Sequence, residues 1–140
     1  MKVYLSTNKP EGTSGKWANS LPMLDGILLN SEGTDIVCDH FISSFSINEY
    51  QELLKKLATK LRLNGKLTIT DIDMNILARR KYNEEIDEDS INAALFSEQK
   101  RKSVSSLISL EGLLPPNLYV EQKHYDHQTC NFTIVARRKS

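Results

Sequence analysis

Cysteine is scarce in this sequence, which contains only Cys38 and Cys130. Two cysteines do not make a disulfide framework, the device that small secreted proteins use in place of a large core. We therefore expect a reduced, cytoplasmic protein in which both thiols are small buried residues. The sequence also opens without the pattern of a signal peptide, because only three apolar-leaning residues separate Lys2 from Ser6.

Net charge and long apolar runs are also absent. The 18 Lys and Arg residues balance 18 Asp and Glu residues, so bulk charge indicates neither a nucleic acid nor an anionic membrane as partner. No apolar run approaches the roughly 18 residues that a membrane span needs. A chain of 140 residues predicts one domain, residues 1–140, able to bury about two-thirds of its unfolded surface.

The clearest local pattern predicts a helix that begins at Ser46. Ser46 and Glu49 have capping-box spacing, in which a hydroxyl and a carboxylate satisfy each other's backbone amides. Asn64 and Gly65, which tolerate a left-handed backbone, predict its end. One apolar stripe follows helical spacing through this segment: Tyr50, Leu53, Leu54, Leu57 and Leu61.

Strand patterns surround this helix. A β-branched run, "TDIVCDHF", precedes it, and "KLTITDID" follows with alternating apolar and polar residues. Strand, helix and strand at this spacing predict a right-handed parallel βαβ unit. "DEDSINAALF" and "SVSSLISLEG" predict shorter helices, and "NLYVEQKHY" with "CNFTIVARR" predict an antiparallel hairpin at the C-terminus. The fold class is therefore α/β, with a mostly parallel sheet and a C-terminal antiparallel hairpin.

Several segments in this order resemble one family of proteins. "KVYLSTN" resembles a first motif "K-L-N-L-G-C-G", and "GKWANS" resembles a second motif "G-W-x-N-x-D". "VCDHFISSF", "LRLNGKLTITDID" and "INAALFSEQ" resemble the later motifs "A-S-H-x-L-E-H-F", "L-K-P-G-G-x-L-x-I-x-V-P-D" and "x-N-x-x-L-F-G-G-Q". The sequence is similar to small class I S-adenosylmethionine-dependent methyltransferases. That resemblance implies a Rossmann-like methyltransferase fold and a site for S-adenosylmethionine.

The sequence departs from these motifs where the cofactor would bind. The two glycine positions of the first turn are Ser6 and Asn8. A left-handed serine would cost about 1–2 kcal/mol. The acidic residue that accepts both ribose hydroxyls is replaced by Ser20, and the loss of a hydrogen bond to a charged group, about 1.5–3 kcal/mol, would weaken binding ten- to hundredfold. Asp25 lies nearby but at the wrong spacing.

The resemblance places a ligand site on a defined set of residues. His40 matches a family histidine, Ser43 and Ser44 replace a Glu-His pair, and Asp73 matches a family carboxylate. His40 and Asp73 are therefore the candidate catalytic residues. The residues expected around the cofactor are Leu5, Ser6, Thr7, Asn8, Asn19, Ser20, Asp39 and His40.

Three functions follow, and one of them is a purely structural or assembly component built on this fold. In the first, the chain is a pseudoenzyme: a methyltransferase-like protein with weakened or lost S-adenosylmethionine binding, acting as a scaffold or through a partner. In the second, it is an active small methyltransferase with an unidentified acceptor. The charged segment 82–102 could cover an acceptor or dock a protein partner or a second copy of the chain.

Other chemical patterns have simpler interpretations. Asp71 and Asp73 have the spacing of a D-x-D metal pair, but acidic pairs are common at strand ends, and we expect no metal. His124, His127 and Cys130 fit solvated turn residues better than a zinc site. Three basic triplets begin at Arg79, Lys100 and Arg137. Acidic runs lie beside them, so solvated faces are favoured over nucleic-acid binding.

Overall fold

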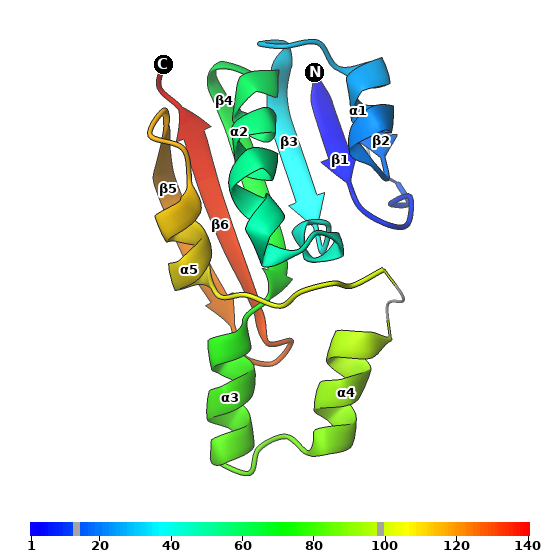
Figure 1. Cartoon of the computed structure of the whole chain (residues 1–140), viewed down its shortest axis with the longest axis vertical. Coiled ribbons are helices and arrows are strands. Elements are labelled where there is room, and N and C mark those ends of the chain that lie inside the picture. Colours follow the sequence, from blue (N-terminus) through cyan, green and yellow to red (C-terminus); the bar gives the residue numbers. More distant parts are fainter. Residues whose placement is uncertain (13–14, 98–99) are drawn as a thin grey trace.

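The computed structural model describes residues 1–12, 15–97 and 100–140 (Figure 1). They contain one six-stranded sheet with the strand order β2-β1-β3-β4-β6-β5. Strands β2, β1, β3 and β4 are mutually parallel, and β6 runs antiparallel to both β4 and β5. The predicted α/β fold class is confirmed. The strands are β1 (Lys2–Leu5), β2 (Lys16–Ala18), β3 (Gly33–Asp39), β4 (Leu61–Ile72), β5 (Leu118–Asp126) and β6 (Asn131–Arg138).

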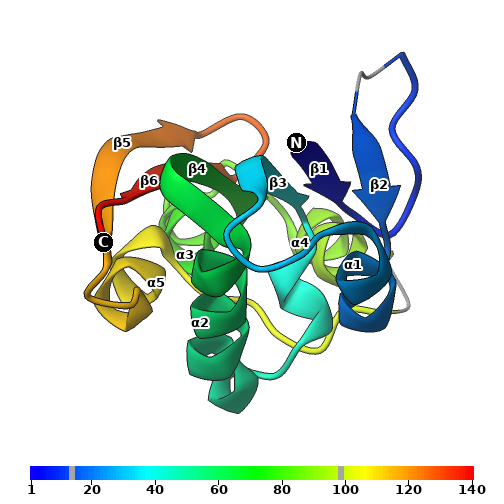
Figure 2. The ribbon, with the colours of Figure 1, turned by 90° about the horizontal axis from the view of Figure 1, so that it is seen from above.

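The helices occupy one face and one edge of this sheet. Helices α1, α2 and α5 lie on the same side, and in the described part of the chain no helix covers the opposite face (Figure 2). Helices α3 and α4 extend beyond the end of the sheet at which β4 terminates (Figure 1). The helices are α1 (Leu21–Ile27), α2 (Tyr50–Lys60), α3 (Met74–Tyr82), α4 (Glu88–Phe96) and α5 (Leu107–Leu113), with 3-10 turns η1 (Ile42–Ser44) and η2 (Ile47–Glu49).

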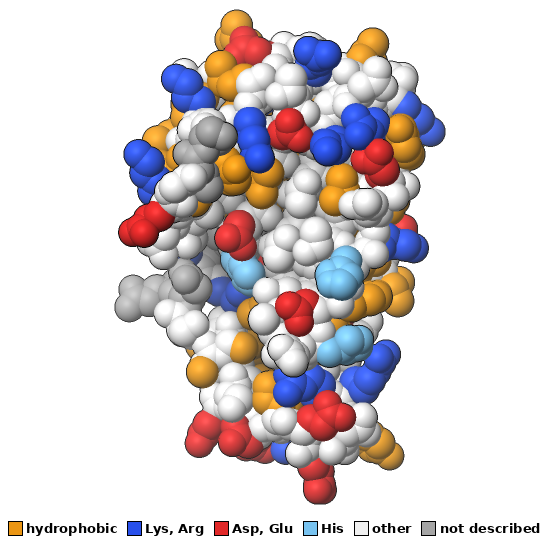
Figure 3. Space-filling view, turned by 180° about the vertical axis from the view of Figure 1, so that it is seen from behind, with side chains coloured by type: hydrophobic (Ala, Val, Ile, Leu, Met, Phe, Trp, Pro, Cys, Tyr) orange, Lys and Arg blue, Asp and Glu red, His pale blue; other side chains and the backbone are white. Residues whose placement is uncertain are grey.

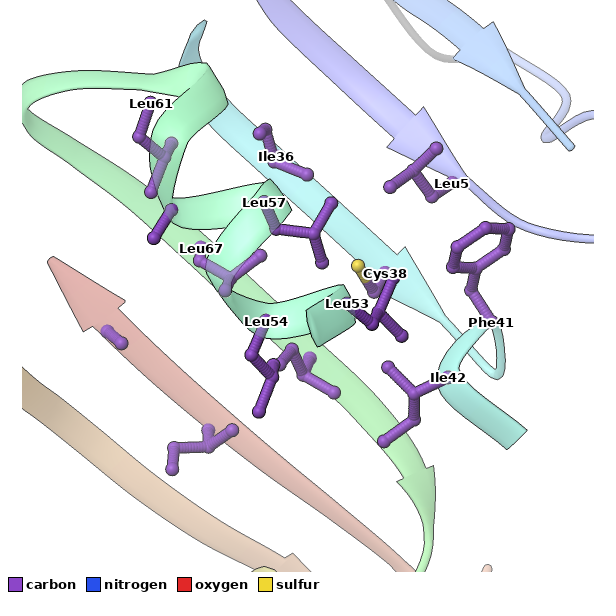
Figure 4. Packing of buried hydrophobic residues seen from close by; sticks show 14 of the residues in the cluster. Leu5, Ile36, Cys38, Phe41, Ile42, Leu53, Leu54, Leu57, Leu61 and Leu67 are labelled. Atoms are coloured by element: carbon purple, nitrogen blue, oxygen red, sulfur yellow. The ribbon is translucent and has the colours of Figure 1, made fainter. Parts of the chain in front are cut away.

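The predicted βαβ unit consists of β3, α2 and β4. Its capping box is present, because the Glu49 carboxylate accepts hydrogen bonds from the Ser46 amide at 3.0 Å and from its hydroxyl at 2.8 Å. The box caps η2, which leads directly into α2. The leucines of α2 face the apolar side chains of β3 and β4 in the core (Figure 4). This packing fixes the carboxyl ends of both strands at one edge.

The predicted end of this helix was wrong. Helix α2 ends at Lys60, and residues 61–65 already belong to β4. Leu61 pairs with Gly33 of β3 and is fully buried, so strand pairing satisfies its backbone while its side chain stays in the core. Asn64 does have a left-handed φ of 65°, but it forms an irregularity within β4 rather than a helix cap.

The sequence patterns did not predict two short helices, α1 and α3. Ser20 caps α1 by accepting a hydrogen bond from the Met23 amide at 3.3 Å. Asp73 caps α3 in the same manner. Helix α5 begins at Leu107, later than the sequence pattern implied, with Ser106 as its N-cap. The hairpin of β5 and β6 matches its prediction.

Both cysteines are free and buried, as predicted, and Cys38 lies in the main hydrophobic core. Burial raises the pKa of the Cys38 thiol far above its ordinary value. No helix among the described residues has the length and apolar character needed to traverse a lipid bilayer.

Candidate functional site

A cavity of about 390 Å³ lies where the parallel strands end. The carboxyl edge of a parallel sheet is the usual ligand position in such folds. Five of the predicted site residues meet there, namely Ser6, Thr7, Asn8, Asp39 and His40. The other described residues of the lining are Ile72, Ala94, Ser97, Arg101, Thr129 and Asn131.

The topology explains why these residues meet. Residues 6–8 follow β1, Asp39 ends β3, and Ile72 ends β4. Arg101 comes from the segment between α4 and α5, and Asn131 begins β6. The antiparallel hairpin therefore contributes to a site that is otherwise formed by parallel strand ends.

The loop after β1 is held by its own polar side chains. The Ser6 hydroxyl donates to the Asn8 carbonyl oxygen at 2.6 Å and accepts from Trp17 Nε1 at 3.1 Å. Neither Ser6 nor Asn8 has a positive φ, so the predicted cost of a left-handed serine was wrong. Serine is accommodated here because the backbone does not enter the conformation that a glycine would allow.

The connection from β1 to β2 is short. Parallel neighbours are usually joined through a helix, whose N-terminus can face a ligand. The described residues of this connection, 6–12 and 15, contain no helix. The loop therefore offers a ligand its own backbone and polar side chains, without a helix dipole behind them.

Three predicted cofactor residues lie outside the cavity lining. Leu5 is fully buried in the core, and Asn19 is exposed at the end of β2. Ser20 is committed to capping α1. Asp25 cannot replace it, because its carboxylate pairs with Lys56 at 2.8 Å and with Lys60 at 3.0 Å.

His40 has oxygen atoms at both ring nitrogens. Nδ1 lies 2.6 Å from Asp39 Oδ1, and Nε2 lies 3.3 Å from Asn131 Oδ1. The hydrogen bond that His40 donates to Asp39 raises the pKa of His40 against the opposing effect of burial, and the same bond lowers the pKa of Asp39. The imidazolium satisfies both oxygens, so this geometry favours a fixed cation over a general base with a free lone pair.

Asp73 is fully buried and does not line the main cavity. Its Oδ1 accepts from the amides of Asn75 and Ile76, at 2.8 and 3.1 Å, and its Oδ2 accepts from the Leu107 amide at 3.0 Å. The carboxylate thus joins the start of α3 to the start of α5. These contacts give Asp73 a structural role, and its catalytic assignment stays a prediction.

Asp71 and Asp73 do not converge on one point. Asp71 accepts from the Ser43 amide at 3.3 Å and pairs with Arg101, whereas Asp73 bonds to helix N-termini. Within residues 1–12, 15–97 and 100–140, no group of three or more His, Cys, Asp or Glu side chains could hold a metal. His124 and His127 are exposed on the hairpin, as predicted.

Arg101 is the site residue that sequence reasoning missed. Its side chain is only 5% exposed, and Nη1 donates to Asp71 Oδ1 at 3.3 Å and to the Ser103 carbonyl at 3.2 Å. The predicted solvated face is therefore wrong at this arginine. Arg80 and Arg138, from the other basic triplets, also bond to backbone carbonyls of the protein. A carboxylate inside the apolar strand β4 was the signal that a buried cation was required.

Comparison with known proteins identifies the fold. Neither a protein-family model nor a curated protein sequence matches this chain. A SAM-dependent methyltransferase from Archaeoglobus fulgidus has a similar structure, with a TM-score of 0.57 and 11% identity over 97% of this chain and 75% of that one. An O-methyltransferase family protein from Burkholderia thailandensis gives a TM-score of 0.55 and 13% identity over 76% of this chain and 30% of that one.

A third similar structure comes from the complex between the Haloferax volcanii Trm112 methyltransferase activator and a methyltransferase. Its TM-score is 0.55 at 7% identity, over 81% of this chain and 57% of that one. The chain spans about half the length of several solved structures that it matches. These likenesses and the strand order show that the chain has the Rossmann-like fold of class I methyltransferases.

Proposed function

We propose that this chain is a methyltransferase-like domain with weakened or lost S-adenosylmethionine binding, which acts as a scaffold or through a protein partner. The observation that carries this proposal is the position of Ser20. In the methyltransferase family that the sequence resembles, this position holds a carboxylate that accepts hydrogen bonds from the ribose hydroxyls. Here the residue is a serine that caps α1 and lies outside the cavity lining. Among the described residues that line the cavity, Asp39 is the one carboxylate, and it is hydrogen-bonded to His40.

The residues present fit one end of S-adenosylmethionine and not the other. The backbone and side chains of Ser6, Thr7 and Asn8 would face the methionine end. Two ribose hydroxyls would need an acceptor at the end of β2, where Asn19 and Ser20 lie outside the lining. The loss of a charge-assisted hydrogen bond costs about 1.5–3 kcal/mol, which weakens a micromolar affinity ten- to hundredfold.

A partner role is supported by the sheet face that no described helix covers. The pairing registers align Trp17, Tyr4, Val37, Thr68 and Val135 in one row across five strands, and each is partly exposed. Figure 3 shows the molecule from this side, with apolar side chains between charged ones. Sheets made of parallel strands are normally covered on both faces. The neighbour from the activator complex agrees with such a role.

A thermal shift with S-adenosylhomocysteine tests the proposal. A ligand at one hundred times its Kd stabilises the folded protein by about 2.7 kcal/mol, a rise of several degrees in Tm for a domain of this size. At one hundred times a micromolar Kd we expect at most about half of this stabilisation, because a ten- to hundredfold weaker site is only partly saturated. A full rise that Asp39→Asn abolishes and the distant control Glu121→Gln retains would overturn the proposal. Light scattering of the purified chain separately determines whether a second copy is the partner.

The second candidate is an active small S-adenosylmethionine-dependent methyltransferase with an unidentified acceptor. It is favoured by one observation, that five of the eight predicted cofactor residues line a single cavity. Under this alternative, Asp39 would replace Ser20 as the ribose acceptor after leaving His40. The same thermal shift separates the two functions, since only the active enzyme needs saturable binding of the cofactor product.

A further inference from the structure

One residue of the cavity at the strand ends, Arg101, contains an unsatisfied guanidinium nitrogen. Arg101 lines the cavity, its side chain is 5% exposed, and its Nε is buried with no hydrogen-bond partner. It is the one such atom in the described part of the chain. Nearly all buried donors in native proteins have a partner, and a missing partner indicates a bound water, ion or ligand.

The geometry of Arg101 limits which atoms a ligand would meet. Nη1 is held by Asp71 and by the Ser103 carbonyl, so that corner of the guanidinium is occupied. The Nε–H remains as a charged donor. Arginine donors of this type match the oxygens of carboxylate and phosphate groups. The ligand group complementary to this nitrogen is therefore an oxygen acceptor that carries negative charge.

Most of the other described lining residues are polar, and His40 adds a second cation when it is protonated. Hydroxyl and amide side chains predominate, namely Ser6, Thr7, Asn8, Ser97, Thr129 and Asn131. His40 stands between Asp39 of β3 and Asn131 of β6, and Asp71 of β4 adds to the field that favours its protonated form. An adjoining surface hollow brings Lys100 next to Thr7, His40 and Arg101.

Charge balance favours an anion at this place. Among the described residues, when His40 is protonated, three cations (His40, Lys100 and Arg101) face two carboxylates (Asp39 and Asp71). Asp71 is engaged by Arg101 and the Ser43 amide, and Asp39 by His40. The positive charge that remains lies on the side of the buried guanidinium.

We propose that this cavity binds the oxyanion group of a small polar ligand, with the Arg101 guanidinium as its hydrogen-bond anchor and protonated His40 as a second source of positive charge. The site needs no nucleoside cofactor, so it stands apart from the proposed function. Inorganic phosphate and acetate are the probes, because they separate a tetrahedral from a planar oxyanion.

The test is a histidine NMR titration of the full chain at constant ionic strength. Saturable binding of either probe shifts the His40 Cε1 resonance and raises the His40 pKa, because an anion stabilises the imidazolium. The exposed His124 and His127 are internal controls and stay unchanged. Affinity falls as pH rises through the His40 pKa. No saturable shift with either probe, or equal shifts in all three histidines, overturns the proposal.

A variant pair locates the anchor. Arg101→Lys keeps a cation beside Asp71 but removes the Nε–H, and we expect a tenfold or greater loss of affinity for the better probe. Arg62→Lys, the same change at an exposed position, retains full affinity. If Arg101→Lys does not fold, Lys100→Ala and Asn131→Ala give the readout, with a reduced affinity expected for both. Unchanged affinity in Arg101→Lys, or in both of the latter variants, contradicts the assignment.

Discussion

The buried pair of Arg101 and Asp71 is the interaction on which the cavity wall depends. Its side chains are 5% and 3% exposed, and it joins the segment after α4 to the end of β4. Removing one partner of a buried ion pair leaves an uncompensated charge and costs about 3–5 kcal/mol. We expect Asp71→Asn to reduce the free energy of unfolding by this amount. For a chain of 140 residues the loss corresponds to a fall in Tm of about 10–17 °C.

A double-mutant cycle isolates the pair. Urea unfolding of Asp71→Asn, Arg101→Gln and the double variant gives the coupling, and we expect the double variant to be more stable than the sum of the single losses predicts. The exposed pair of Lys55 and Glu52, at 3.6 Å, is the control, and Glu52→Gln should cost less than about 1 kcal/mol. A loss below about 0.5 kcal/mol in Asp71→Asn, or strictly additive losses, would refute the reasoning.

Three further changes probe other parts of the account. Asp73→Ala removes the N-cap of α3 and the acceptor for the Leu107 amide, and we expect a loss of about 2–4 kcal/mol in urea unfolding; Asp73→Asn should retain part of it. Asp39 raises the pKa of His40 in the folded protein above its value of about 6.5 in the unfolded chain. The protonated His40 therefore stabilises the fold at pH values below about 6.5, and this stabilisation is lost as the pH rises through the pKa of the folded state. His40→Gln should therefore flatten the dependence of Tm on pH above about 6, and an unchanged profile would contradict the assigned partner. Leu57→Ala opens a cavity beneath the sheet and should cost about 2–5 kcal/mol in the same unfolding assay, whereas a loss below about 1 kcal/mol would contradict its place in the core.

Periodicity predicted the elements that have a long apolar pattern. The stripe from Tyr50 to Leu57 and the two strands of the hairpin have clear periods, and the structure contains both. The end of α2 was misplaced because Leu61 is buried equally well as the next residue of a helical stripe or as the first residue of a strand. Helix α1 was missed because seven residues hold too little periodicity, and its Ser20 cap had been interpreted through the family motif.

The candidate site was predictable only where strand ends determine it. Residues 6–8 and Asp39 follow strands whose order the sequence indicated, and these residues line the cavity. Arg101 was missed because its partner, Asp71, lies 30 residues away and meets it only through the path of the chain after α4. The contact between His40 and Asn131, which lie 91 residues apart in the sequence, was missed for the same reason. Local patterns carry no information about such distant pairs.

Calorimetric titration of the purified chain with S-adenosylhomocysteine tests the central claim most directly. We expect no saturation at micromolar ligand, because Ser20 caps α1 and the carboxylate of Asp39 is bonded to His40. Saturable binding with a micromolar Kd, lost in Asp39→Asn, would contradict it and would identify the chain as a cofactor-binding methyltransferase.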